Sequence, residues 1–129
     1  MPRLLACLAL LFAVVCGTPL HAQTLRVMSF NVRTLSANDG ANAWEHRRDL
    51  AARVVRDARP DLMGTQELHQ SQGDDLVARL PGYAWFGIGR RGNAGDEHMG
   101  VFYRTDRLKV LASGSYWLSD TPNVPGSQT

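Results

Sequence analysis

LRVMSFN at residues 25–31 and DLMGTQE at residues 61–67 are the two stretches from which the architecture of this chain follows. The first alternates apolar and polar residues and then becomes apolar on both faces at Met28 and Phe30, which is typical of a strand buried in a sheet. The second is a short, mostly apolar run after Pro60, and it predicts another buried strand at residues 61–66. Asn31 ends the first predicted strand, and Glu67 follows the second.

Residues 44–58, between the two predicted strands, have the spacing of an amphipathic helix. Arginines occupy the other faces of this helix, Asn42 and Glu45 have capping-box spacing at its start, and Pro60 ends it. A strand, a helix and a strand predict a βαβ unit with parallel strands. We therefore expect Asn31 and Glu67 at the same edge of the sheet, where such sheets bind ligands. The apolar positions that recur at three- and four-residue spacing are Leu50, Ala51, Val54, Val55 and Ala58.

The remainder of the chain indicates a mixed α/β (α+β) fold. A second helix is expected at about residues 71–80, where Pro81 and Gly82 end it. Aromatic and β-branched residues predict strands at residues 83–88, 100–104 and 108–118. Residues 89–96 form a Gly-rich loop, and residues 120–129 have the composition of a loop.

Residues 1–22 have the layout of a secretory signal peptide, with Arg3, an apolar run at residues 4–15 and then small and polar residues. The apolar run is shorter than the roughly 18 residues that a membrane-spanning helix needs, so no stable membrane span is expected. We expect cleavage after Ala22 and export to the periplasm or the cell exterior. Lipid attachment at Cys16 is the alternative. Both cysteines precede residue 23, so the mature chain, residues 23–129, would contain no disulfide.

The composition is that of an ordinary globular domain. With 44% hydrophobic residues and a net charge of +2, the chain is neither a disordered tail nor a membrane protein. A non-specific nucleic-acid binder usually shows a basic stripe, so the charge alone does not indicate one.

Asn31 and Glu67 are the sharpest pair of candidate site residues. A hard cation such as Mg²⁺ takes oxygen ligands, often one or two carboxylates with waters and substrate phosphate oxygens. A carboxylate and a carboxamide at a common sheet edge meet the first part of that requirement. From the spacing alone, two solvated loop residues would be the simpler interpretation.

The surrounding sequence resembles a known family. SFNVR at residues 29–33 and PDLMGTQE at residues 60–67 resemble the two opening motifs of the endonuclease/exonuclease/phosphatase superfamily, the metal-dependent phosphoesterases that include DNase I-like enzymes. The likeness continues to the YWLSDTP motif at residues 116–122, which is similar to exported bacterial members. The resemblance covers essentially residues 23–129 and implies the amino-terminal half of a DNase I-like four-layer α/β sandwich.

The resemblance also implies roles for four residues. Asn31 and Glu67 match the metal- and phosphate-site residues, with Asn31 also counted as catalytic, and the implied cofactor is Mg²⁺, with Mn²⁺ as an alternative. Glu97 matches the catalytic carboxylate that orients a histidine, and Arg90 matches a phosphate-binding position. The carboxylate would hold the imidazole tautomer and favour its protonated form.

Other polar and aromatic residues have simpler interpretations. Arg91 is interpreted as surface charge, and His69 and His98 as solvated or hydrogen-bonded side chains away from the family's histidine positions. The three tryptophans are interpreted as packing residues. They are Trp44, Trp85 and Trp117.

A complete member of the family also needs a catalytic histidine, an Asp-x-Asn pair and a terminal Asp-His, and nothing in residues 1–129 matches them. We therefore expect the amino-terminal fragment of an exported Mg²⁺-dependent phosphoesterase, inactive by itself. Its phosphoester substrate could be nucleic acid, a small phosphodiester, or a sugar or lipid phosphate. The alternatives are a secreted endonuclease and a stable non-catalytic or vestigial binding domain. The sequence does not indicate an oligomeric state.

Overall fold

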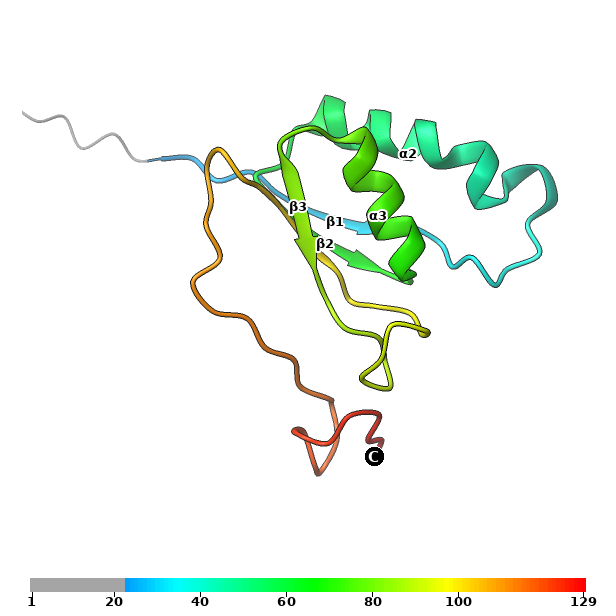
Figure 1. The fold of residues 1–129 in the computed structure, drawn as a ribbon, viewed down its shortest axis with the longest axis vertical. Coiled ribbons are helices and arrows are strands. Elements are labelled where there is room, and N and C mark those ends of the chain that lie inside the picture. Colours follow the sequence, from blue (N-terminus) through cyan, green and yellow to red (C-terminus); the bar gives the residue numbers. More distant parts are fainter. Residues whose placement is uncertain (1–22) are drawn as a thin grey trace, which may run out of the picture.

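The computed structural model describes residues 23–129 as one mixed sheet covered by two helices (Figure 1). The predicted signal peptide, residues 1–22, lies outside the described residues. The strands follow the order β1-β2-β4-β3 across the sheet. The elements are β1 (Val27–Asn31), the 3₁₀ turn η1 (Gly40–Asn42), α2 (Trp44–Ala58), β2 (Leu62–Gln66), α3 (Gln70–Arg79), β3 (Tyr83–Phe86) and β4 (Val101–Arg104).

The predicted βαβ unit is confirmed. Strands β1 and β2 pair in parallel with Asn31 opposite Gln66, and α2 forms the crossover between them. Parallel strands place their carboxyl ends at one edge of the sheet, so the residues that follow β1 and β2 lie side by side. Strand β4 pairs antiparallel with both β2 and β3.

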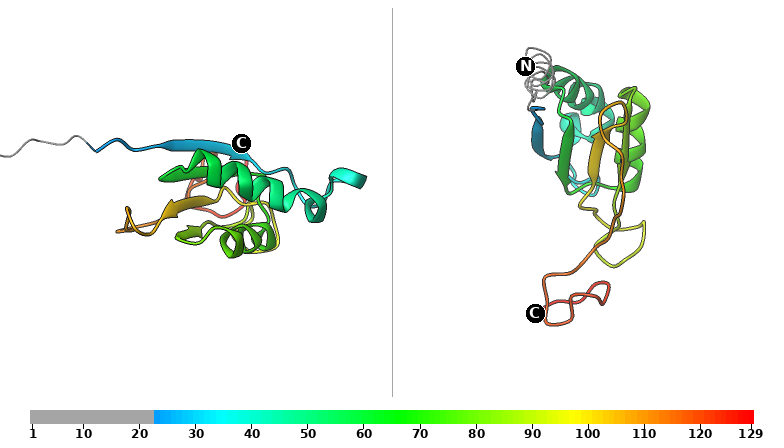
Figure 2. Two further views of the ribbon diagram at one scale, coloured as in Figure 1. Left: turned by 90° about the horizontal axis from the view of Figure 1, so that it is seen from above. Right: turned by 90° about the vertical axis from the view of Figure 1, so that its left-hand side faces the viewer.

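The hydrophobic core lies between the sheet and the two helices, which lie on one side of it (Figure 2). Met63 of β2 and Phe102 of β4 are fully buried against Val55 of α2 and Leu76 of α3. Trp85 of β3 stacks on Phe102 with 5.7 Å between the ring centroids. Each such buried side chain contributes about 1.5–3 kcal/mol to the stability of the fold.

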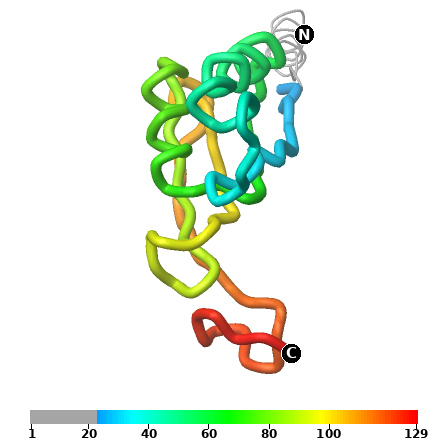
Figure 3. The backbone as a smooth tube through the Cα atoms, turned by 90° about the vertical axis from the view of Figure 1, so that its right-hand side faces the viewer, coloured from blue at the N-terminus to red at the C-terminus, as the bar shows by residue number. Residues whose placement is uncertain are grey.

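The other face of the sheet is partly open. Its apolar side chains include Val27, which is 63% exposed, and the Phe86–Tyr103 pair, whose ring centroids lie 6.2 Å apart. Residues 108–112 line a shallow cavity over this face. The chain after β4 then runs past the sheet to a separate turn near its carboxyl end (Figure 3).

The strand predicted at residues 108–118 is wrong, because residues 108–129 contain no strand. Leu111 and Leu118 are 90% and 86% exposed. The β-propensity of a sequence is expressed only where a neighbouring strand accepts its side chains and hydrogen bonds. In the described sheet, residues 108–118 have no such neighbour.

Two predictions about α2 are also wrong, the second of them in part. Asn42 belongs to η1, and the residue that caps α2 is Ala43, without a side-chain hydrogen bond, so Asn42 and Glu45 form no capping box. The predicted apolar face of α2 is right only in part. Ala51 and Val55 are buried, but Leu50 and Val54 are 56% and 40% exposed, and Ala52 is buried as well.

Candidate active site

Asn31 and Glu67 meet at the carboxyl edge of the parallel strands, as the sequence predicts. The Asn31 Nδ2 atom donates a hydrogen bond to Glu67 Oε1 over 2.8 Å. The register of β1 and β2 sets this meeting, since Asn31 lies opposite Gln66, the residue before Glu67.

The backbone at the site is strained. Glu67 has φ of 58° and Arg33 has φ of 62°, both in the left-handed region that non-glycine residues seldom adopt. Such conformations cost about 1–3 kcal/mol each and persist only where surrounding contacts impose them. Two backbone amides of the turn after β1 provide such contacts. Arg33 N donates to Asn31 Oδ1 over 2.8 Å, and Thr34 N donates to Glu67 Oε2 over 3.0 Å.

The carbonyl groups of the same turn are held from the helical layer. Arg47 of α2 donates through Nη1 to Val32 O over 2.5 Å and through Nη2 to Arg33 O over 3.0 Å. Gln72 of α3 donates through Nε2 to Arg33 O over 2.9 Å. The turn therefore orients both site side chains through its amides, while its carbonyls are fixed by both helices.

The carboxylate of Glu67 is electrostatically favoured. The Asn31 side chain and then the Thr34 amide lower the pKa of Glu67 below its ordinary value, burial opposes them, and the charge of Arg33 adds a smaller lowering. Glu67 is therefore ionised at neutral pH, and each of its oxygens keeps a lone pair beyond the hydrogen bond it accepts.

Asn31 and Glu67 line a cavity of about 780 Å³. Its polar lining also includes Gln66, Arg90, Glu97 and His98. Trp117, which also lines the cavity, donates a hydrogen bond from Nε1 to Arg90 O over 2.5 Å. The apolar lining consists of Ile88, Met99, Tyr116, Trp117 and Leu118.

Arg90 and Glu97 both reach this cavity and are paired with each other. Arg90 Nη2 donates to Glu97 Oε2 over 2.5 Å, and Arg90 N donates to Glu97 O over 2.9 Å. In residues 23–129 the carboxylate of Glu97 is therefore bonded to an arginine rather than to a histidine. The sequence predicted both residues for the site but gave no signal that they pair.

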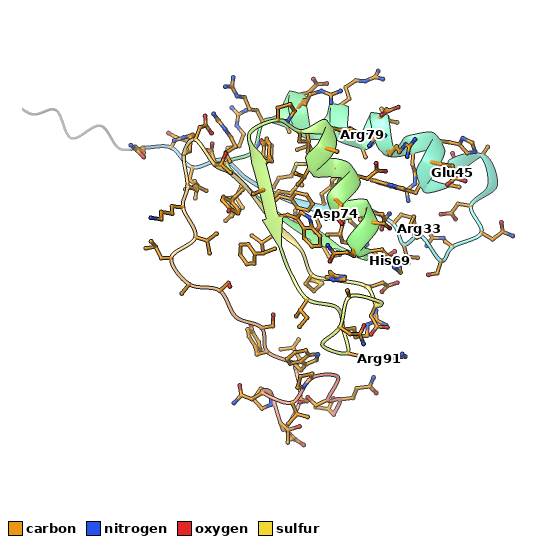
Figure 4. All side chains as sticks on the ribbon, in the orientation of Figure 1. Arg33, Glu45, His69, Asp74, Arg79 and Arg91 are labelled. Atoms are coloured by element: carbon orange, nitrogen blue, oxygen red, sulfur yellow. The ribbon has the colours of Figure 1, made fainter. Side chains whose placement is uncertain are left out.

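The remaining sequence interpretations have mixed outcomes. His69 is hydrogen-bonded, as expected, and Arg91 is an exposed charge near Asp96 (Figure 4). His98 is buried instead, edge-on to Trp85, and its Nδ1 has no partner among the described residues. Trp117, which the sequence suggested as a packing residue, is partly exposed and lines the cavity.

Residues 23–129 bring together no group of three or more His, Cys, Asp or Glu side chains that could hold a metal ion by themselves. Within the same residues, neither helix has the length and apolar character needed to cross a membrane.

Residues 28–123 match the Endonuclease/Exonuclease/phosphatase family. The chain is similar to the mannosyl-6-phosphatase of Bacteroides thetaiotaomicron, with 39% identity and a TM-score of 0.75 over 79% of this chain and 39% of that one. An endonuclease/exonuclease/phosphatase of Bacteroides vulgatus is 35% identical, with a TM-score of 0.78 over 82% of this chain and 41% of that one. An uncharacterized protein of Acanthamoeba polyphaga mimivirus is 24% identical, over 82% of this chain and 18% of its own length.

The chain thus spans about two fifths of the length of these solved structures and less than a fifth of the viral relative. The sheet and its two helices correspond to part of the DNase I-like fold of the neighbours, which confirms the predicted fold class. Since the family match extends over most of its residues, the chain belongs to the endonuclease/exonuclease/phosphatase family, whose members are hydrolases of phosphoesters.

Proposed function

We propose that this chain is the amino-terminal part of an exported phosphoester hydrolase that depends on a divalent cation, Mg²⁺ or alternatively Mn²⁺. The observation that carries the proposal is the Asn31–Glu67 pair, which lines a cavity and is held by a strained turn. Strain that is maintained by several hydrogen bonds at a cavity is typical of functional sites.

The donor chemistry of the pair fits such a cation. Glu67 offers an ionised carboxylate and Asn31 a carboxamide oxygen, and both are the hard ligands that Mg²⁺ prefers. When bound, the cation would polarise a phosphoryl oxygen as a Lewis acid. In this proposal Glu67 holds the cation, and Asn31 holds the Glu67 carboxylate and faces the substrate phosphate.

Arg90 and Glu97 have complementary roles in the proposal. The guanidinium of Arg90 binds phosphate oxygens through charge-assisted hydrogen bonds, which compete with its pairing to Glu97. Glu97, released from Arg90, orients a histidine that assists the attack of water. This histidine is proposed to lie in the part of the relatives that the chain does not span.

The apolar lining of the cavity supports a substrate with a ring next to its phosphate. Tyr116 and Trp117 present aromatic side chains to the cavity, and aromatic faces pack well against flat or ring-shaped groups. A sugar phosphate is our first choice, since the similar protein of Bacteroides thetaiotaomicron is a mannosyl-6-phosphatase. A secreted endonuclease is the second, and the net charge of +2 gives it little support.

The cation site can be tested by binding Mn²⁺ to the chain and following free Mn²⁺ by electron paramagnetic resonance. The Glu67→Gln variant is expected to lose at least about ten-fold in affinity, because a neutral amide replaces an anionic ligand. Glu45→Gln is the matched control, since Glu45 is exposed on α2. Equal Mn²⁺ affinity in the unaltered chain and in Glu67→Gln would refute the proposed site.

A further inference from the structure

His69 is linked to the site through one intermediate residue. Its Nε2 atom shares a hydrogen bond of 2.9 Å with Thr34 Oγ1. The amide of the same threonine donates to Glu67 Oε2 over 3.0 Å. His69 and the turn that carries Arg33 lie at the same end of the molecule (Figure 4), joined also by Gln72, which donates to Arg33 O.

The position of Thr34 matters because the Glu67 side chain is bonded at both oxygens. Oε1 accepts from Asn31 and Oε2 accepts from the Thr34 amide. The first of these groups belongs to a regular strand, whereas the second belongs to a turn that follows the left-handed residue Arg33. The orientation of the carboxylate therefore depends on whatever fixes Thr34.

Side chains of the two helices bind backbone carbonyls in only part of the turn. Arg47 and Gln72 bind the carbonyls of Val32 and Arg33, which precede Thr34. The contact from α3 to Thr34 itself is made by the imidazole of His69, the residue that caps this helix.

We propose that His69 is a positioning residue, whose imidazole holds Thr34 so that the Thr34 amide aims the Glu67 carboxylate at a divalent cation. The inference rests on the proposed function, and it gives a role to a histidine that the sequence motifs leave aside. Residues that orient metal ligands without contacting the metal typically contribute about 10- to 100-fold to metal affinity.

The role of the imidazole can be separated from the role of His69 in the helix. The backbone N–H of His69 donates to Gln72 Oε1 over 2.9 Å, and asparagine or glutamine at this position keeps that N–H. Asparagine is a favoured helix cap but is too short to reach Thr34. Glutamine is long enough to place a polar nitrogen near the position of the imidazole Nε2.

The experiment compares Mn²⁺ affinity in the full chain and in His69→Asn, His69→Gln and Thr34→Val. His69→Asn and Thr34→Val are each expected to weaken binding by about ten-fold. The double variant His69→Asn/Thr34→Val should bind Mn²⁺ no more weakly than either single variant, because His69 acts on the cation site through Thr34. His69→Gln should retain most of the affinity, and the melting temperature of His69→Asn should be unchanged. Hydrogen exchange of the Thr34 amide should be faster in both weakened variants.

The outcomes distinguish this inference from the proposed function. Mn²⁺ binding that is absent, or that Glu67→Gln does not weaken, would overturn the proposed function and this inference with it. Binding that depends on Glu67 but not on His69 or Thr34 would overturn the positioning role alone. The same conclusion would follow if the affinity of His69→Asn fell with its melting temperature and glutamine gave no rescue.

Discussion

Asp61 is a buried carboxylate that two arginine side chains pair with. Its carboxylate is 2% exposed and accepts hydrogen bonds from the Arg26 amide over 2.8 Å and from Arg107 Nη1 over 2.7 Å, with Arg104 Nη1 at 3.3 Å. Asp61 immediately precedes β2, whereas Glu67 follows it. One short strand thus carries a structural carboxylate at one end and the candidate site at the other.

Asp61→Asn is expected to lower the melting temperature by several degrees at neutral pH, because the arginines lose their buried anionic partner. The Arg26 amide and then Arg107 lower the pKa of Asp61 against an opposing effect of burial. A lowered folded pKa stabilises the fold above the ordinary aspartate pKa of about 3.9, and this stability is lost as pH falls through the folded pKa. Melting curves between neutral and acid pH should therefore converge for the unaltered chain and Asp61→Asn.

Asp57→Asn, on the exposed face of α2, is the control, and equal melting temperatures of all three proteins at pH 7 would contradict the prediction.

At the scale of elements, α3 depends on a close contact with β3. A Cβ atom at Gly73 would lie 2.4 Å from the ring of Trp85, which is itself stacked on Phe102. Gly73→Ala should therefore destabilise the fold by about 1–3 kcal/mol through overpacking, although alanine is favoured over glycine in a helix by about 1 kcal/mol. Urea unfolding measures the change in the free energy of unfolding.

Ser71→Ala, on the exposed part of α3, is the control. It gains only the helix preference of alanine and should be neutral or stabilising. A stabilised Gly73→Ala would mean that Trp85 does not pack against α3 in this way.

Sequence patterns predict the elements whose partners are near in the chain. Strand β1, α2 and β2 form one βαβ unit, so periodicity and Pro60 suffice to predict them and the meeting of Asn31 with Glu67. The same kind of pattern wrongly predicted a strand at residues 108–118, because a strand also requires a partner strand that its own sequence does not reveal. The contacts that brace the site were not predictable either. Arg47 and Gln72 bind the carbonyl of Arg33, whose left-handed conformation no sequence pattern indicated.

At the scale of the whole molecule, the two faces of the sheet differ in kind. The helical face is closed by the core and also fixes the turn that orients Asn31 and Glu67. The opposite face leaves Val27 and the Phe86–Tyr103 pair accessible, and β1 is an edge strand of the described sheet. The core of the helical layer can therefore be stable while the open face remains exposed, because Val27, Phe86 and Tyr103 are not among its side chains.

The open face leads to a prediction about association. Exposed apolar residues on an edge strand promote contacts between chains, and lysine is the substitution that suppresses them most directly. Val27→Lys should reduce the concentration-dependent association of the chain in sedimentation experiments and its binding of a hydrophobic dye. Its melting temperature should change little, since Val27 is 63% exposed. Met63→Lys, one strand away but fully buried on the helical face, should instead prevent folding, which separates an effect of the open face from a general effect of lysine. A chain that stays monomeric at high concentration, with Val27→Lys behaving identically, would contradict this prediction.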